Sequence, residues 1–204
     1  AGVERSNLNR AHPGVADGGA TEQLAYGFMQ LIQQEAVDLA IDLHEASPEY
    51  PVVDALVAHE RAMELAAMVS MELEFEGIPI RLEPSPKNLR GLSHREWGDN
   101  ADVLAILMET CNASAGRFRG RTDERLVHEG EDKAYDKAAE LGRLYVPWES
   151  YDKKIEQRVG RHVTAVRLLA DNLEYVREGK GIAIDGLPAF QQLSAQGVGA
   201  FLSD

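Results

Sequence analysis

The chain has 204 residues, of which 44% are hydrophobic, and a formal net charge of −13. This hydrophobic content is sufficient for one large or two small globular domains and argues against intrinsic disorder. The negative charge disfavours contact with nucleic acid phosphates and anionic lipid headgroups, so we expect no nucleic acid partner and no membrane partner.

The acidic excess is greatest between Glu22 and Glu76, where twelve Asp and Glu residues are balanced only by Arg61. We interpret these acids as solvated helix faces; a preference for cationic partners is the alternative. The single cysteine, Cys111, excludes an internal disulfide framework and is expected to be a small buried hydrophobe. No stretch approaches the ~20 apolar residues of a membrane span and no signal peptide is recognised, so we expect a soluble chain whose compartment stays open.

The N-terminal region is predicted to be a loop followed by a helix. Residues 1–20 contain proline and several glycines without a sustained period, which is typical of an extended loop. Thr21 is expected to cap a helix that ends near Glu35. Its apolar face is predicted from four positions, Leu24, Phe28, Leu31 and Ile32.

Three segments have the character of strands. Apolar and polar residues alternate over residues 37–43, directly before His44, and a short strand is expected over residues 78–82. Residues 103–108 form a continuous apolar run before Glu109, as in a strand covered on both faces. In sheets of this kind ligands collect at the carboxyl ends of strands, where both His44 and Glu109 are expected.

Between these strands we predict a second helix, capped by Asp54 and ending near Glu74, and a polar loop over residues 87–100. Strands alternating with helices favour an α/β fold with a mostly parallel or mixed sheet flanked by helices.

The C-terminal part is expected to be helical. A basic loop over residues 116–125 precedes predicted helices at 132–144 and 148–178, and residues 182–204 have weak strand or short-helix character. We therefore divide the chain into an α/β domain, residues 1–145, and a helical extension, residues 146–204, that packs on it.

Four residues are candidates for chemistry. His44 after a strand is either a metal ligand or a polar cap, and Glu109 after a buried strand is either a general base or half of an ion pair. Asn9 and Arg10 can bind a carboxylate or brace their loop.

The sequence around these residues resembles motifs of the zinc carboxypeptidase-like superfamily, in the same order along the chain, especially those of its succinylglutamate desuccinylase and aspartoacylase branch. The motifs are residues 7–14 (NLNRAHPG), 42–44 (DLH) and 108–110 (MET). The resemblance covers roughly residues 3–135, the later part of that family's domain, and implies a partial zinc-carboxypeptidase-like fold.

The resemblance also implies roles. Asn9 and Arg10 would bind the substrate's carboxylate, His44 would be a ligand of Zn²⁺, and Glu109 would activate the zinc-bound water.

Two features depart from the family's pattern. His12 stands where the family usually has an aromatic residue, and no His-x-x-Glu motif precedes Asn9 to supply the remaining zinc ligands. The one His-x-x-Glu here, His128 to Glu131, lies downstream, and we interpret it as coincidental.

Two explanations of the missing motif stay open. Either the chain is a fragment whose missing N-terminal segment was removed, is disordered or forms a separate chain, or it descends from the enzyme and no longer binds zinc. The start without methionine favours the fragment. Because a catalytic zinc needs about three protein ligands, we expect the isolated chain to bind zinc poorly and to be inactive alone.

The resulting hypothesis is a zinc-dependent amide hydrolase, of carboxypeptidase or N-acyl amino acid deacylase type, acting on a small carboxylate-bearing or peptide substrate. A non-catalytic carboxylate-binding module and a helical interaction module around residues 148–178 are the alternatives. Arg90, Arg95 and the arginines of residues 117–125 are interpreted as surface charges, with recognition of an acidic acyl group as the second possibility.

Overall fold

The computed structural model describes residues 7–129, 133–148 and 154–202. This part of the chain contains a four-stranded sheet with the order β1-β4-β2-β3. The strands are β1 (Leu39–Ala46), β2 (Ala55–Ala58), β3 (Arg81–Pro84) and β4 (Leu104–Cys111). β1 is parallel to β4 and β2 is parallel to β3, whereas β2 is antiparallel to β4. The predicted α/β class is confirmed, and the sheet is mixed.

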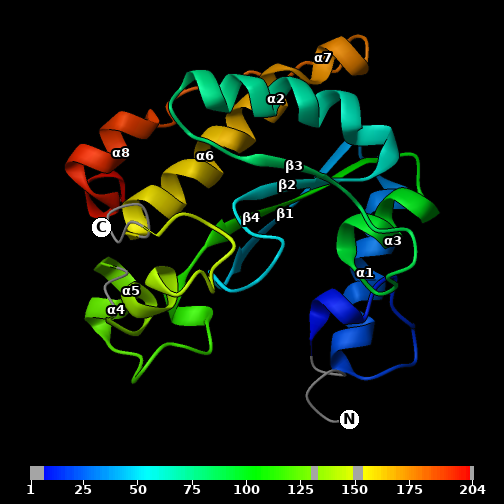
Figure 1. The fold of residues 1–204 in the computed structure, drawn as a ribbon. Coiled ribbons are helices and arrows are strands. Elements are labelled where there is room, and N and C mark those ends of the chain that lie inside the picture. Colours follow the sequence, from blue (N-terminus) through cyan, green and yellow to red (C-terminus); the bar gives the residue numbers. More distant parts are fainter. Residues whose placement is uncertain (1–6, 130–132, 149–153, 203–204) are drawn as a thin grey trace.

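Helices flank the sheet on both faces. They are α1 (Ala20–Gln34), α2 (Met63–Phe75), α3 (Ser93–Asn100), α4 (Glu124–Glu129), α5 (Lys133–Glu140), α6 (Ile155–Asp171), α7 (Leu173–Val176) and α8 (Phe190–Gln196). Figure 1 shows α2 and α6 together over one face, with α1 and α3 at one end of the sheet. Short 3-10 turns lie at Leu8–Arg10, Glu60–Ala62, Ala113–Ala115 and Val198–Phe201.

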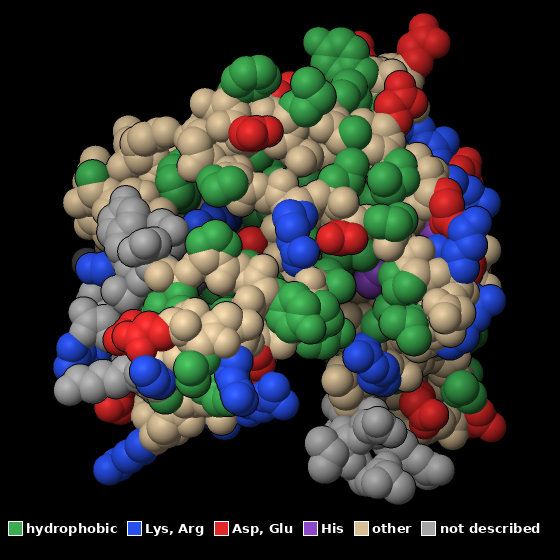
Figure 2. All heavy atoms as spheres, viewed as in Figure 1, with side chains coloured by type: hydrophobic (Ala, Val, Ile, Leu, Met, Phe, Trp, Pro, Cys, Tyr) green, Lys and Arg blue, Asp and Glu red, His purple; other side chains and the backbone are tan. Residues whose placement is uncertain are grey.

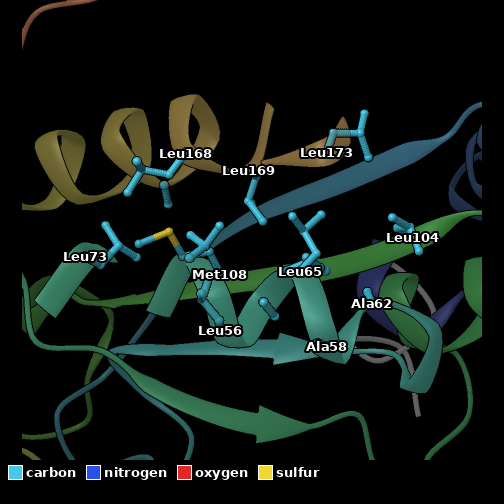
Figure 3. Close-up of a cluster of buried hydrophobic side chains, with 14 of the residues drawn as sticks. Leu56, Ala58, Ala62, Leu65, Leu73, Leu104, Met108, Leu168, Leu169 and Leu173 are labelled. Atoms are coloured by element: carbon cyan, nitrogen blue, oxygen red, sulfur yellow. The ribbon is translucent and has the colours of Figure 1, made fainter. Parts of the chain in front are cut away.

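The main hydrophobic core lies between the sheet and the pair α2 and α6. Leu56 of β2 and Met108 of β4 pack there with Leu65 of α2 and Leu169 of α6, as Figure 3 shows. The cluster therefore combines side chains from the predicted α/β domain with side chains from the predicted helical extension. Burial of this apolar area is the main contribution to the stability of the fold.

The opposite face of the sheet is only partly covered by helices. Met29 of α1 and Trp97 of α3 pack there on Val103 and Ala105. Further along β4, Leu107 projects from the same face of the sheet, where it lines a cavity.

β2 was not predicted, and the helix expected from Asp54 was placed too early. All four residues of β2 are buried and apolar, a short run that periodicity cannot distinguish from helix. Asp54 instead accepts a hydrogen bond from the backbone N–H of Cys111 at 2.8 Å. The helix proper begins at Met63, after the 3-10 turn. Cys111 is fully buried, as expected.

The polar segment predicted as a loop over residues 87–100 contains α3. Its residues Ser93 to Gly98 are buried although most of them are polar or charged. Arg95, interpreted from sequence as a surface charge, is 2% exposed and forms ion pairs with Glu60 and Asp99. The buried face of α3 is thus formed largely by paired charged groups. It lacks the apolar stripe by which a helix is recognised in a sequence.

The face of α1 also differs from the prediction. Leu24, Phe28 and Leu31 are exposed, while Ile32 is buried together with Ala25 and Met29. The residue before the helix is Gly19, whose N–H is accepted by Glu22 at 2.8 Å; Thr21 lies inside the first turn. The helix ends at Gln34, one residue before the expected position.

The C-terminal helices follow the prediction in outline. α5 lies within the first predicted segment, and α6 and α7 lie within 148–178, of which residues 149–153 are outside the described part. α4 occupies the end of the predicted basic loop and the residues after it, while α8 gives the tail its short-helix character. Among the described residues, no helix combines the length and apolar character needed to cross a bilayer.

Replacing Leu169 by alanine is expected to lower the free energy of unfolding by about 2–5 kcal/mol, because this fully buried side chain joins α6 to the sheet. Urea denaturation followed by circular dichroism measures the loss. The matched control is Met71→Ala on α2, where the side chain is 61% exposed and the expected change is about 0.5 kcal/mol or less. Equal effects of the two substitutions would contradict the packing of α6.

Candidate active site

His44 and Glu109 lie opposite each other on neighbouring strands. They are register partners of the parallel strands β1 and β4 and therefore project from the same face of the sheet. Nδ1 of His44 is 3.8 Å from Oε1 of Glu109. Each residue lies two positions before the last residue of its strand, so the predicted location near the carboxyl ends is met.

Asp42 fixes the other side of the His44 ring. Residues two apart in a strand point to the same face, and Nε2 of His44 lies 3.2 Å from Oδ2 of Asp42. The hydroxyl of Ser93, at the start of α3, donates a hydrogen bond to the same carboxylate. A histidine that ligates a metal usually gives its other ring nitrogen to a carboxylate in this way.

The Asn9-Arg10 pair is joined to this group through α3. The side chain of Asn7 accepts the Asn9 N–H at 3.0 Å, which forms the 3-10 turn, and the side chain of Asn9 accepts the Ser93 N–H at 2.7 Å. Nη1 of Arg10 donates to the carbonyl of Asn9 at 2.5 Å. Hydrogen bonds thus connect Asn9, Ser93, Asp42 and His44 in one chain.

All four residues predicted from the sequence line one cavity of about 350 Å³. Its wall also contains apolar side chains from both central strands and from the loops around residues 46–52 and 86–92. Figure 2 shows the molecule indented between the α4–α5 region and α1, with hydrophobic side chains and a histidine close to the indentation. The volume is in the range of sites for small organic ligands.

The electrostatics of the group favour proton exchange near neutral pH. Burial raises the pKa of Glu109 to about 7, against the opposing charges of His44 and Arg10. The hydrogen bond to Asp42 raises the pKa of His44, with burial acting in the other direction. Burial alone would raise the pKa of Asp42, but hydrogen bonds from His44 and Ser93 outweigh it and leave that pKa below its ordinary value. A carboxyl group with a pKa near neutrality is suited to general acid-base catalysis.

Sequence reasoning missed the contributions of Asp42, Ser93 and His94 to this site. For Asp42 the signal was present, since it stands two residues before His44 in an alternating strand. For Ser93 and His94 no signal was available, because both lie in the segment predicted as loop.

The other candidates among the described residues are not part of the cavity lining. His12 is buried and packs edge-on against Trp97 at a ring distance of 5.2 Å. Arg90 forms an ion pair with Asp99. His128 lies in α4, and Glu131 is outside the described residues.

The described residues do not form a metal site by themselves. Among residues 7–129, 133–148 and 154–202, no group of three or more His, Cys, Asp and Glu side chains is arranged to hold a metal ion. His44 offers one ring nitrogen, whereas a catalytic zinc takes about three protein ligands. The described part of the chain therefore does not fit a complete zinc centre by itself.

Comparison with protein-family models, with curated proteins and with solved structures finds no match to this chain. The roles of the four residues thus depend on their motifs and on the geometry described above.

Replacing Glu109 by glutamine is expected to change the pH dependence of stability. The pKa of Glu109 is about 7 in the folded chain and 4.5 ordinarily, so the folded state holds more protons between these values and loses stability as the pH rises through them. Above pH ~7 the variant should be about 1–3 kcal/mol more stable than the parent, and below pH ~4.5 the difference should vanish. Urea unfolding of chelator-treated parent and variant across this pH range measures the difference in stability. A difference that does not change with pH would contradict the raised pKa of Glu109.

Gly91 is predicted to be essential for the position of Arg10. Its φ is +84°, and an added Cβ would lie 2.5 Å from the carbonyl oxygen of Arg10. Gly91→Ala should therefore destabilise the chain by about 1–3 kcal/mol and weaken carboxylate binding.

The matched control for this glycine is Gly27→Ala in α1, where an added Cβ meets nothing within 4 Å and a gain of about 0.5–1 kcal/mol is expected. Thermal unfolding and titration with acetate compare the two variants. Unchanged carboxylate binding in Gly91→Ala would show that the loop does not position Arg10.

Proposed function

We propose that this chain carries the substrate-binding and proton-transfer half of a zinc-dependent amide hydrolase that acts on a carboxylate-bearing substrate. Carboxypeptidase and N-acyl amino acid deacylase activities both fall within this class. The observation that supports the proposal is the juxtaposition of His44 with Glu109 in a cavity that Arg10 also lines.

Arg10 is proposed to bind the substrate's carboxylate. Arg10 lines the cavity, and its positive charge lowers the pKa of Glu109 against the larger effect of burial, which raises it. The forked N–H groups of a guanidinium suit a carboxylate. Asn9 holds this turn to α3 through Ser93, so the position of the bound carboxylate is fixed relative to Glu109. Such fixed positioning can lower the barrier by several kcal/mol, on the order of 7 or more in favourable cases.

Glu109 is proposed to move the proton. Its pKa near 7 allows it to accept a proton from an attacking water and to return that proton to the leaving amine. His44, held at Nε2 by Asp42, would present Nδ1 as one metal ligand, with the remaining ligands from outside the described residues. When bound, zinc supplies Lewis-acid polarisation of the carbonyl and a more acidic water.

A carboxylate-binding module without catalysis is the second candidate. It requires only Asn9, Arg10 and the cavity wall, all of which belong to the described residues. The helical interaction module is less favoured, because the apolar face of α6 packs on the sheet and α2 within the same chain.

The test combines metal content with hydrolysis. Protein produced under zinc-replete conditions as the whole gene product should contain about one zinc per site and hydrolyse N-acyl amino acids or short peptides. Glu109→Ala should reduce kcat by about 10²–10⁴-fold with nearly unchanged zinc, since the carboxylate acts on the proton. Inductively coupled plasma spectrometry and an amine-release assay provide the two measurements.

Glu83→Gln serves as the control, because this carboxylate lies on β3 and does not line the cavity. Zinc-free protein that still binds carboxylates through Arg10 would establish the second candidate instead. Loss of carboxylate affinity in Arg10→Ala is expected under either function.

A further inference from the structure

His94 is a buried polar group on the cavity wall that the proposed chemistry does not use. It lies in the first turn of α3, is 3% exposed and lines the same cavity as Glu109 and Arg10. Neither of its ring nitrogens has a hydrogen-bond partner in the described structure. By contrast, the buried ring of His59 has partners at both nitrogens, Asp99 and the Arg61 N–H.

A buried imidazole without a partner is costly. Leaving a buried donor or acceptor unsatisfied costs about 1–3 kcal/mol, so a protein retains such a group where a ligand or bound water completes it. Burial lowers the pKa of His94 to about 4, which leaves the ring neutral, with one N–H donor and one acceptor nitrogen. A hydroxyl group can either donate to the acceptor nitrogen or accept from the N–H, so it satisfies whichever of the two ring nitrogens the ligand reaches.

The surroundings of His94 restrict what can approach it. Val57 and Leu107 of the sheet and Leu92 before α3 contribute apolar wall to the cavity. Among the described lining residues, Arg10 is the only lysine or arginine, while Glu45 and Glu109 are acidic. A ligand with one carboxylate can be paired by Arg10, whereas a second carboxylate would find no second lysine or arginine among these described residues and would lie in a wall with two acidic side chains.

We propose that His94 is a specificity residue that selects substrates with one carboxylate and an apolar side chain ending in an uncharged hydrogen-bonding group, such as the phenol of tyrosine. This inference rests on the proposed function, because it takes the carboxylate to be bound by Arg10. It excludes dicarboxylic substrates as the preferred class.

The experiment measures the binding of three probes, N-acetyl-tyrosine, N-acetyl-phenylalanine and N-acetyl-glutamate, by ligand-observed NMR titration. N-acetyl-tyrosine should bind about tenfold more tightly than N-acetyl-phenylalanine, because its hydroxyl gains one hydrogen bond to His94. N-acetyl-glutamate should bind most weakly of the three. His94→Leu should bring the tyrosine affinity down to the phenylalanine value and leave phenylalanine unchanged. His94→Gln should retain part of the preference.

Tyr50→Phe is the matched control, since it removes another hydrogen-bonding group from the same wall and should leave the preference intact. Equal affinities of the parent chain for tyrosine and phenylalanine would overturn the proposal without any variant. Preferred binding of glutamate, or equal losses for both aromatic probes in folded His94→Leu, would also overturn it. Failure of the proposed function has a different signature: absence of zinc and hydrolysis while the tyrosine preference in binding persists.

Discussion

The parallel pairing of β1 with β4 determines the geometry of the site. It places His44 opposite Glu109 and Asp42 opposite Leu107, so an imidazole, two carboxylates and an apolar wall project from one face of the sheet. Side chains alternate along a strand, and a shift of one residue would send His44 to the face that holds the main core. Hydrophobic packing on that face, around Met108, keeps the register fixed. The arrangement of polar groups in the cavity is therefore a consequence of apolar burial behind it.

α3 provides the second constraint. Its start connects Asn9 to Asp42 through Ser93, and its following turns are anchored by the ion pairs of Arg95 with Glu60 and Asp99. Buried charges of this kind add little net stability, but they are strongly destabilising when one partner is lost. This helix accordingly ties the turn of Asn9 and Arg10 to the strand that carries His44, while Trp97 supplies its apolar packing on Val103 and Ala105.

The strands with a clear hydrophobic pattern could be predicted from the sequence. The alternation before His44 and the apolar run before Glu109 predicted two strands, and their parallel arrangement predicted that the two side chains would be close. β2 was not predicted, because a run of four buried apolar residues has no periodicity that distinguishes a strand from a helix. α3 and the buried face of α1 were not predicted, because tertiary contacts, rather than the local sequence pattern, decide which of their side chains are buried. Arg95 of α3 is buried, for example, while Leu24 of α1 is exposed. The roles of Ser93 and His94 follow from the placement of α3 and were therefore beyond sequence reasoning.

The division of β4 between its two faces has a practical outcome for the evolution and redesign of this chain. Ile106 and Met108 contact the core, whereas Leu107 between them lines the cavity. Exchanges at Leu107 should alter which ligands are accepted, and exchanges at Ile106 or Met108 should alter resistance to denaturation. Ligand selectivity and stability can thus be adjusted separately at neighbouring residues of a single strand.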